Sequence, residues 1–203
     1  MLYPLPVVMV SCGDSPENHN IITVAWTGIV CSDPPMCYIS VRKDRHSHAI
    51  ISRTKEFVIN LTTDALAKAT DWCGVRSGRD YNKFKEMHLA IEQAERVSAP
   101  MIAESPVNIE CKVMEIKELG SHDMFVAEIV AVHGDEKYFD QSTGLFQLNQ
   151  AELIAYSHGK YYTLGEKIGK FGFSVEKIKH KRKTSTPSFR PERSGVEKSK
   201  IKK

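Results

Sequence analysis

A dense group of potential anion ligands lies in residues 40–48, where the sequence reads Ser-Val-Arg-Lys-Asp-Arg-His-Ser-His. A helix is expected to begin near the end of this segment, and the free N–H groups of a helix N-terminus favour negative charge. Guanidinium and hydroxyl donors beside it would strengthen an anion site. The simpler interpretation is a solvated loop in which one serine caps the helix. The candidate ligands are Ser40, Arg42, Arg45, Ser47 and His48.

The segment 20–35, NIITVAWTGIVCSDPP, combines small and aromatic residues. In one continuous strand, Thr23, Ala25 and Thr27 would share one face, and Trp26 would lie on the other. Small residues beside an indole leave room for a flat ring to approach the backbone, whose N–H groups can bind the carbonyl oxygens of a heterocycle. A core strand followed by a turn explains the same pattern without a ligand, so both interpretations stay open.

Several chemistries are disfavoured by motifs that the sequence lacks. There is no G-x-S-x-G, no G-x-G-x-x-G after a strand and no G-x-x-x-x-G-K-[ST]. A Rossmann domain is therefore not expected, and any nicotinamide must bind elsewhere or transiently. The five cysteines include no C-x-x-C, and the eight histidines show no H-E-x-x-H spacing. This pattern predicts buried structural thiols, Cys31 included, and no metal site.

The elements that must position these residues are short and mostly β. Apolar, β-branched runs bounded by turn residues predict strands at 7–11, 20–30, 36–41, 57–61, 107–116 and 124–133. Helical spacing predicts helices at 46–55 and 63–72, a short helix at 81–84 and one further short element within 153–162. The sequence shows no regular alternation of strands and helices, as βαβ units would require, and no internal repeat. The pattern is typical of a mainly β fold with short helices, built as a small antiparallel barrel.

The charge is divided unevenly along the chain. The formal net charge is +3, but residues 180–203 hold nine Lys or Arg and only two Glu. We therefore expect a mildly acidic domain at 1–179 and a basic, flexible tail at 180–203. No run approaches the roughly 20 apolar residues of a membrane span, and the N-terminus does not resemble a signal peptide. A cytoplasmic location is the expectation.

Taken together, the motifs resemble the flavin reductase-like family, and most of all its flavoredoxin branch. The resemblance covers about residues 3–175, and the order and spacing of its pieces make it specific. It depends on the matching segments at 3–6, 20–26, 33–35, 40–42, 45–47, 57–61, 77–79, 83–84, 120–122 and 125–128. One departure is Ala127-Glu128-Ile129, where the family has Gly-Glu-Val.

The resemblance implies an antiparallel Greek-key split β-barrel that binds FMN at a homodimer interface. It implies that Asn20 and Trp26 flank the isoalloxazine, and that the backbone from Thr23 through Ala25 to Thr27 meets its polar edge. The ribityl-phosphate end would be lined by the five candidates in residues 40–48, namely Ser40, Arg42, Arg45, Ser47 and His48. Lys83 would add a cation near the flavin, His122 would lie beside the ring, and both are candidate catalytic residues. Tyr156 is a looser match to an aromatic near the cofactor.

Three functions compete at this stage. The favoured one is an NAD(P)H-dependent flavin reductase that transfers hydride from NADH or NADPH to FMN. The second is an electron carrier of flavoredoxin type, reduced by a protein partner. The third is a module whose basic tail binds nucleic acid or an acidic surface, although nucleic acid is not the expected partner.

Overall fold

The computed structural model describes residues 2–176. The chain divides into two compact units, Met1–Gly165 and Glu166–Lys203. The described part of the second unit holds a 3-10 turn, η4 (Phe173–Val175), and an ion pair of 2.5 Å between Lys170 and Glu176. The basic tail predicted at 180–203 lies outside the described residues.

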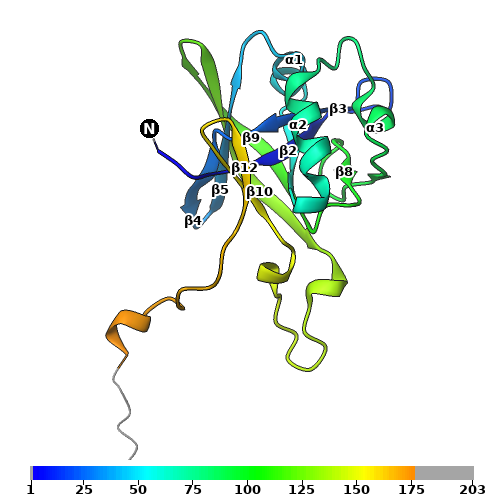
Figure 1. The fold of residues 1–203 in the computed structure, drawn as a ribbon. Coiled ribbons are helices and arrows are strands. Elements are labelled where there is room, and N and C mark those ends of the chain that lie inside the picture. The colour runs from blue at the N-terminus through cyan, green and yellow to red at the C-terminus, as the bar shows by residue number, and fades with distance from the viewer. Residues whose placement is uncertain (1, 177–203) are drawn as a thin grey trace, which may run out of the picture. The chain divides into compact units, whose positions relative to one another are not determined.

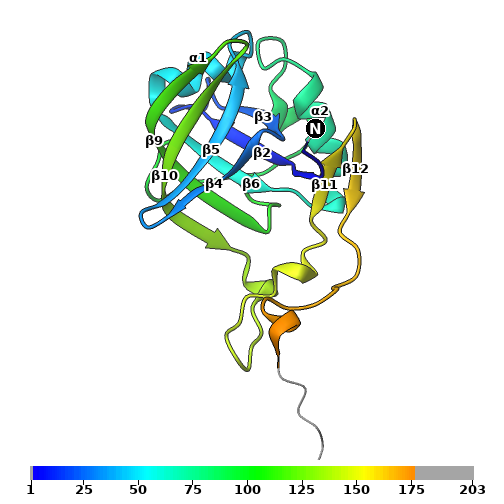
Figure 2. The same cartoon turned by 90° about the vertical axis from the view of Figure 1, so that its left-hand side faces the viewer.

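The first unit is built on one antiparallel sheet that curls into an open barrel (Figures 1 and 2). Its strand order is β3-β2-β6-β9-β10-β5-β4, and every neighbouring pair is antiparallel. The strands are β2 (Val8–Cys12), β3 (Asn20–Val24), β4 (Thr27–Ser32), β5 (Pro35–Arg42), β6 (Glu56–Leu61), β9 (Val107–Leu119) and β10 (His122–Gly134). The predicted antiparallel split barrel is confirmed.

The sequence prediction was wrong about the strand at 20–30. The chain breaks at Ala25-Trp26, and β3 and β4 lie at opposite ends of the sheet order. These two residues therefore carry the chain from one edge of the barrel to the other. Side chains alternate between two faces only along a continuous strand, so the predicted division of 23–28 into two faces does not hold.

Helices and two small sheets complete the unit. The helices are α1 (His46–Thr54), the 3-10 turn η1 (Asp64–Leu66), α2 (Ala67–Val75) and α3 (Lys83–Glu86), with further 3-10 turns η2 (Glu136–Tyr138) and η3 (Leu148–Gln150). The small sheets are formed by β1 (Leu5–Pro6) with β11 (Ile154–Ser157) and β12 (Lys160–Thr163), and by β7 (Ile91–Glu92) with β8 (Met101–Ile102). The element expected within 153–162 is thus a hairpin. No helix in the described part is long and apolar enough to cross a membrane.

The barrel interior holds the main hydrophobic core. Phe57 and Phe125 are fully buried there, and replacing such a side chain with Ala typically costs about 3–5 kcal/mol. Four cysteines are buried and Cys31 is half-buried. The four buried cysteines, Cys12, Cys37, Cys73 and Cys111, pack as small side chains, as predicted. The prediction of burial was wrong for Cys31, which lies on the edge strand β4.

Buried polar side chains fix loops to this core. The Asn60 Nδ2 group donates to Met9 O at 2.9 Å, and its Oδ1 accepts from Ile102 N at 2.9 Å. The Glu110 carboxylate, with no exposed surface, accepts the backbone N–H groups of Glu95 at 2.9 Å and Arg96 at 2.6 Å. These bonds hold strand β8 against β6 and the loop near residue 95 against β9.

Candidate functional site

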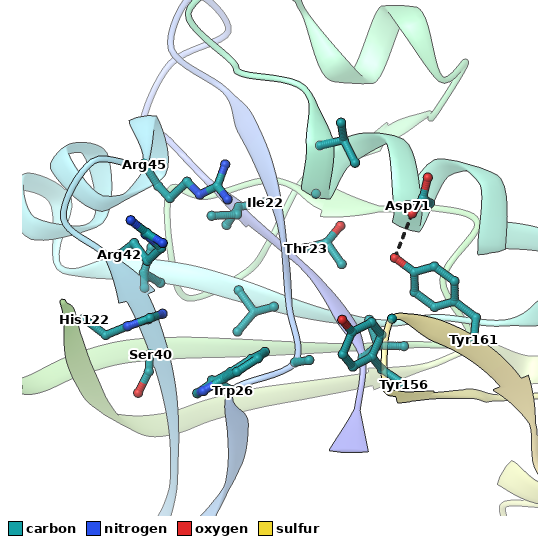
Figure 3. A pocket seen from close by; sticks show the side chains of 17 residues that line it. Ile22, Thr23, Trp26, Ser40, Arg42, Arg45, Asp71, His122, Tyr156 and Tyr161 are labelled. Atoms are coloured by element: carbon teal, nitrogen blue, oxygen red, sulfur yellow. Dashed lines mark hydrogen bonds between the residues drawn. The ribbon is translucent and has the colours of Figure 1, made fainter. Parts of the chain in front are cut away.

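A cavity of about 510 Å³ opens where β3 passes into β4 (Figure 3). One side is formed by the ends of β3 and β5 and the start of β10, and the other by α2 and the β11–β12 hairpin. Its volume lies within the range of small-molecule sites. The lining residues relevant to the argument are Thr23, Ala25, Trp26, Ser40, Arg42, Arg45, Asp71, Gly74, His122, Tyr156 and Tyr161.

One end of this first cavity is cationic and flat-walled. Arg42, Arg45 and His122 lie together there, with Trp26 below them in Figure 3. The indole and imidazole rings are nearly parallel, at an interplanar angle of 14° and a centroid distance of 6.3 Å. A backbone hydrogen bond of 2.8 Å from Ser40 N to Trp26 O ties the β3–β4 crossing to β5. The indole is therefore held at the cavity while half of its surface stays exposed.

The other end of the first cavity is aromatic and carries a carboxylate. The Tyr161 hydroxyl donates to Asp71 Oδ1 at 3.1 Å, which joins β12 to α2. Tyr156 meets Tyr161 edge to face, with centroids 5.7 Å apart. The two ends thus differ in charge, which gives a bound molecule a preferred direction.

A second cavity of about 200 Å³ adjoins the first and shares Ile22, Arg45 and Gly74 with it. Its other lining residues are mostly polar or cationic: Asn20, Asp44, His46, Ser47, Cys73, Arg76, Ser77, Gly78, Arg79 and Lys83. The joined cavities suit a flat ring connected to an anionic group.

The second cavity carries more positive than negative charge. Its cations are Arg45, Arg76, Arg79 and Lys83, and within residues 2–176 none of them forms an ion pair with a carboxylate. The acidic lining residue, Asp44, is paired with the Arg42 guanidinium at 3.3 Å. Guanidinium groups without carboxylate partners favour an anionic ligand.

Lys83 is the buried cation of the second cavity, with 3% of its surface exposed. Its ammonium donates to Ile21 O and to Cys73 O, each at 2.7 Å. An ammonium has three donors, so one is left for a ligand. Burial, together with the nearby charge of Arg45, lowers the pKa of Lys83 to about 8. The resemblance implied a cation near the flavin, and the structure places this one in the second cavity and not beside Trp26.

Asn20 and Ser47 also lie in the second cavity. Asn20 Nδ2 donates to Ser47 Oγ at 2.7 Å, and both side chains are buried. Asn20 thus lines the second cavity, whereas Trp26 lines the first. Gly78 approaches Asn20 so closely that a Cβ atom there would lie 2.1 Å from Asn20 Oδ1. The second cavity thus depends on a glycine at this position.

Two expected ligands face elsewhere. The Thr27 hydroxyl donates to Tyr38 O at 2.7 Å and does not line either cavity. His48 Nε2 lies 2.8 Å from Asp123 Oδ2, so this side chain joins α1 to β10. Ser40, expected at the anionic end, lines the first cavity beside Trp26. Of the three residues that line both cavities, Arg45 is the charged one.

The cavity residues that sequence reasoning did not place in the site include Arg76, Arg79, Asp71 and Tyr161. Arg76 and Arg79 flank Ser77-Gly78, a segment recognised for its resemblance but not as part of the site. Both arginines lie within two residues of Gly78, and this grouping of cations around a glycine could have indicated an anion site. Asp71 and Tyr161 come from elements 90 residues apart, and nothing in the local sequence of either indicates that they meet.

No group of three or more His, Cys, Asp or Glu side chains within residues 2–176 is arranged to hold a metal ion. The candidate site therefore consists of the two joined cavities.

Comparison with known proteins agrees with this architecture. The family model described as flavin reductase like domain matches residues 1–165. Flavoredoxin of Desulfovibrio vulgaris (Miyazaki F) is 30% identical with a TM-score of 0.79, covering 87% of this chain and 95% of its own. A flavoredoxin from Methanosarcina acetivorans is 27% identical with a TM-score of 0.76 and the same coverage. A putative flavin reductase with a split barrel domain from Shewanella frigidimarina, 23% identical over 84% of this chain and 86% of its own, shares the fold with a TM-score of 0.74. The chain belongs to the flavin reductase-like family.

Proposed function

We propose that the protein binds one FMN per protomer and acts as a flavin-dependent oxidoreductase. The observation that carries this proposal is the pair of joined cavities, one flat-walled and one cationic, with Arg45 at their junction. Membership of the flavin reductase-like family supports it.

The residues present fit FMN in shape and in charge. A phosphate monoester carries about −1.5 to −2 charges at pH 7 and three acceptor oxygens. Arg45, Arg79, Lys83 and Ser47 supply donors around the second cavity. Gly74, on α2, lines both cavities, and a Cβ there would lie 3.2 Å from Thr23 Cβ, so the glycine keeps this position free of a side chain. A position without a side chain where the cavities meet suits a thin polar chain such as ribityl.

Bound flavin supplies the redox chemistry, and the protein binds it, orients it and adjusts its electrostatics. Trp26 offers a flat wall for the ring, and the backbone at 23–26 offers N–H groups for its polar edge. His122 is bonded at one ring nitrogen to Ser121 Oγ, at 2.9 Å, which leaves the other nitrogen for the ring edge. Arg42 adds positive charge at the same end and favours the anionic reduced form.

We infer that the electron donor is NADH or NADPH, which makes the protein an NAD(P)H-dependent flavin reductase. The first cavity is large enough for a second flat ring at its aromatic end. The competing function is an electron carrier reduced by a protein partner, which the similarity to two flavoredoxins favours. Anaerobic single-turnover mixing separates them: bleaching of bound flavin by NADH or NADPH supports the reductase, and bleaching by neither supports the carrier.

We also propose a homodimer. Ile29 is 71% exposed and Val30 is 53% exposed, and both lie on the edge strand β4, next to Trp26. A contiguous exposed apolar surface usually marks an interaction site. Light scattering of the flavin-loaded protein tests this, and a monomer that binds FMN tightly would contradict it.

The decisive experiment is a visible spectrum of the purified protein, followed by titration with FMN, FAD and riboflavin. The cationic second cavity predicts that FMN binds more tightly than riboflavin, and the absence of an adenylate motif predicts that it binds more tightly than FAD. If no flavin binds, the proposed function fails.

A further inference from the structure

The β11–β12 hairpin is held to the rest of its unit on one side, at its base and at its turn, where the rings of Tyr3 and His158 lie 4.3 Å apart. Backbone pairing of β11 with the two-residue strand β1 holds one side, and Ile154 N donates to Thr62 O at 3.2 Å at the base. Within residues 2–176, the side-chain hydrogen bond from this hairpin to another element is the one from Tyr161 to Asp71. Along the outer strand β12, this bond is therefore the side-chain hydrogen bond of the described residues that links the hairpin to α2.

That fastening crosses the aromatic end of the first cavity, as the dashed line in Figure 3 shows. Tyr156 and Tyr161 on the hairpin form one wall, and Asp71 and Gly74 on α2 form the opposite wall. The position of α2 is fixed independently, because Thr23 Oγ1 donates to Thr70 O at 2.5 Å and Lys83 binds Cys73 O. When the bond breaks, the hairpin is the part that can move.

The donor of this bond, the Tyr161 hydroxyl, keeps its proton at neutral pH. Burial and the neighbouring Asp71 raise the pKa of Tyr161 to about 12, so the phenol stays a neutral donor. Asp71 itself is exposed, so solvent competes for the carboxylate. A solvent-exposed hydrogen bond of this kind shifts an opening equilibrium by roughly two- to fivefold.

We infer that the Tyr161–Asp71 hydrogen bond is a gate that selects the redox partners of the site by size. With the bond formed, small flat molecules of the size of a quinone or a nicotinamide ring reach the cavity, and bulky partners such as a haem protein are held away. The negative charge of Asp71 at this end disfavours anionic rings. The inference rests on the proposed function and adds to it the class of partner that the site admits.

The test compares Tyr161→Phe with Tyr162→Phe, a matched control at the neighbouring, half-exposed tyrosine, which does not line the cavity. Flavin-loaded protein is photoreduced with EDTA and then reoxidised anaerobically. Benzoquinone takes up both electrons with two protons, and cytochrome c takes up one electron per haem, so two haems are reduced per flavin. We expect the rate with cytochrome c, divided by the rate with benzoquinone, to rise at least twofold in Tyr161→Phe and to stay constant in Tyr162→Phe.

Hydrogen–deuterium exchange of the same variants reports on the hairpin directly. The amides of residues 154–163 should exchange at least twofold faster in Tyr161→Phe than in Tyr162→Phe. Asp71→Ala should behave like Tyr161→Phe, while Asp71→Asn, which keeps an acceptor oxygen, should resemble the wild type. If Tyr161→Phe binds flavin but changes neither the rate ratio nor the amide exchange, the gate is overturned. The proposed function then remains intact. Absence of bound flavin removes the proposed function and the gate with it.

Discussion

The Lys83 ammonium donates a hydrogen bond of 2.7 Å to the carbonyl oxygen of Cys73 in the last turn of α2. The same group holds Ile21 O on β3 at 2.7 Å, so one buried cation joins a helix and an edge strand beside the second cavity. Lys83 therefore shapes the anion site as well as adding charge to it. A change in the protonation state of Lys83 should therefore change the affinity of the site for an anionic ligand.

FMN affinity should fall as the pH rises above about 8, the value to which burial lowers the pKa of Lys83. A bound phosphate favours the charged ammonium and raises its pKa, so affinity is full below the free-state pKa and is lost as the pH rises through it. We expect Kd to increase by about three- to tenfold between pH 7 and pH 9.5. Fluorescence titration measures it. Lys83→Met should bind more weakly and lose the pH dependence, whereas Lys85→Met, exposed on the same helix, should keep it.

Arg45→Ala should weaken FMN binding far more than riboflavin binding, because this side chain reaches the anion cavity. A charge-assisted hydrogen bond contributes roughly 1.5–3 kcal/mol, so Kd for FMN should rise about tenfold or more. Isothermal titration with both flavins measures the difference. Arg96→Ala, which removes an exposed arginine that lines neither cavity, serves as the control. Equal losses for the two flavins would place the phosphate elsewhere.

Gly78→Ala should damage the site through Asn20. The added Cβ would lie 2.1 Å from Asn20 Oδ1, so the amide must move and its bond to Ser47 must break. Overpacking of this kind costs about 1–3 kcal/mol, and FMN affinity should fall with it. Gly165→Ala is the matched control, since nothing lies within 4 Å of its added Cβ. Calorimetric melting and FMN titration of both variants test the prediction. Unchanged stability and unchanged FMN affinity in Gly78→Ala would refute it.

Glu110→Gln should destabilise the protein without changing the cavities. Although burial alone opposes its ionisation, the N–H groups of Glu95 and Arg96 and the His133 ring lower the pKa of Glu110. A carboxyl with a lowered folded-state pKa contributes stability above its unfolded value of about 4.3, and this is lost as the pH falls through the folded value. The variant should lose about 2–3 kcal/mol at pH 7, and the loss should shrink below pH 4. Denaturant unfolding measures it, with the exposed Glu115→Gln as control.

The sequence predicted the sheet well because local patterns carried the information. Alternation of apolar and polar residues in β9 and β10 and the run at Phe57 are visible without any partner strand. The break at Ala25-Trp26 was not predictable in this way. Both residues suit a strand, and the crossing exists only because β4 pairs with β5 while β3 pairs with β2.

Site residues that are close together in the sequence could likewise be predicted, whereas residues that only folding brings together could not. Arg42, Arg45 and Ser47 lie within one short segment, and the structure places all three at the cavities. His48 belongs to the same segment but points to Asp123, because helical spacing turns neighbouring side chains in different directions. Asp71 meets Tyr161 only in the folded chain, so no local pattern could reveal that pair.

The long hairpin of β9 and β10 also has a consequence for folding speed. Its strands run from Val107 to Leu119 and from His122 to Gly134 with one short connection, so its pairing involves only local closure. By contrast, β10 must find β5 across some eighty residues, with Phe125 opposite Ile39, and β6 must find β9 across about fifty. Sheets dominated by such distant pairings have high contact order and fold on a timescale of about milliseconds to seconds. The hairpin is the part of the barrel that can form before that search ends.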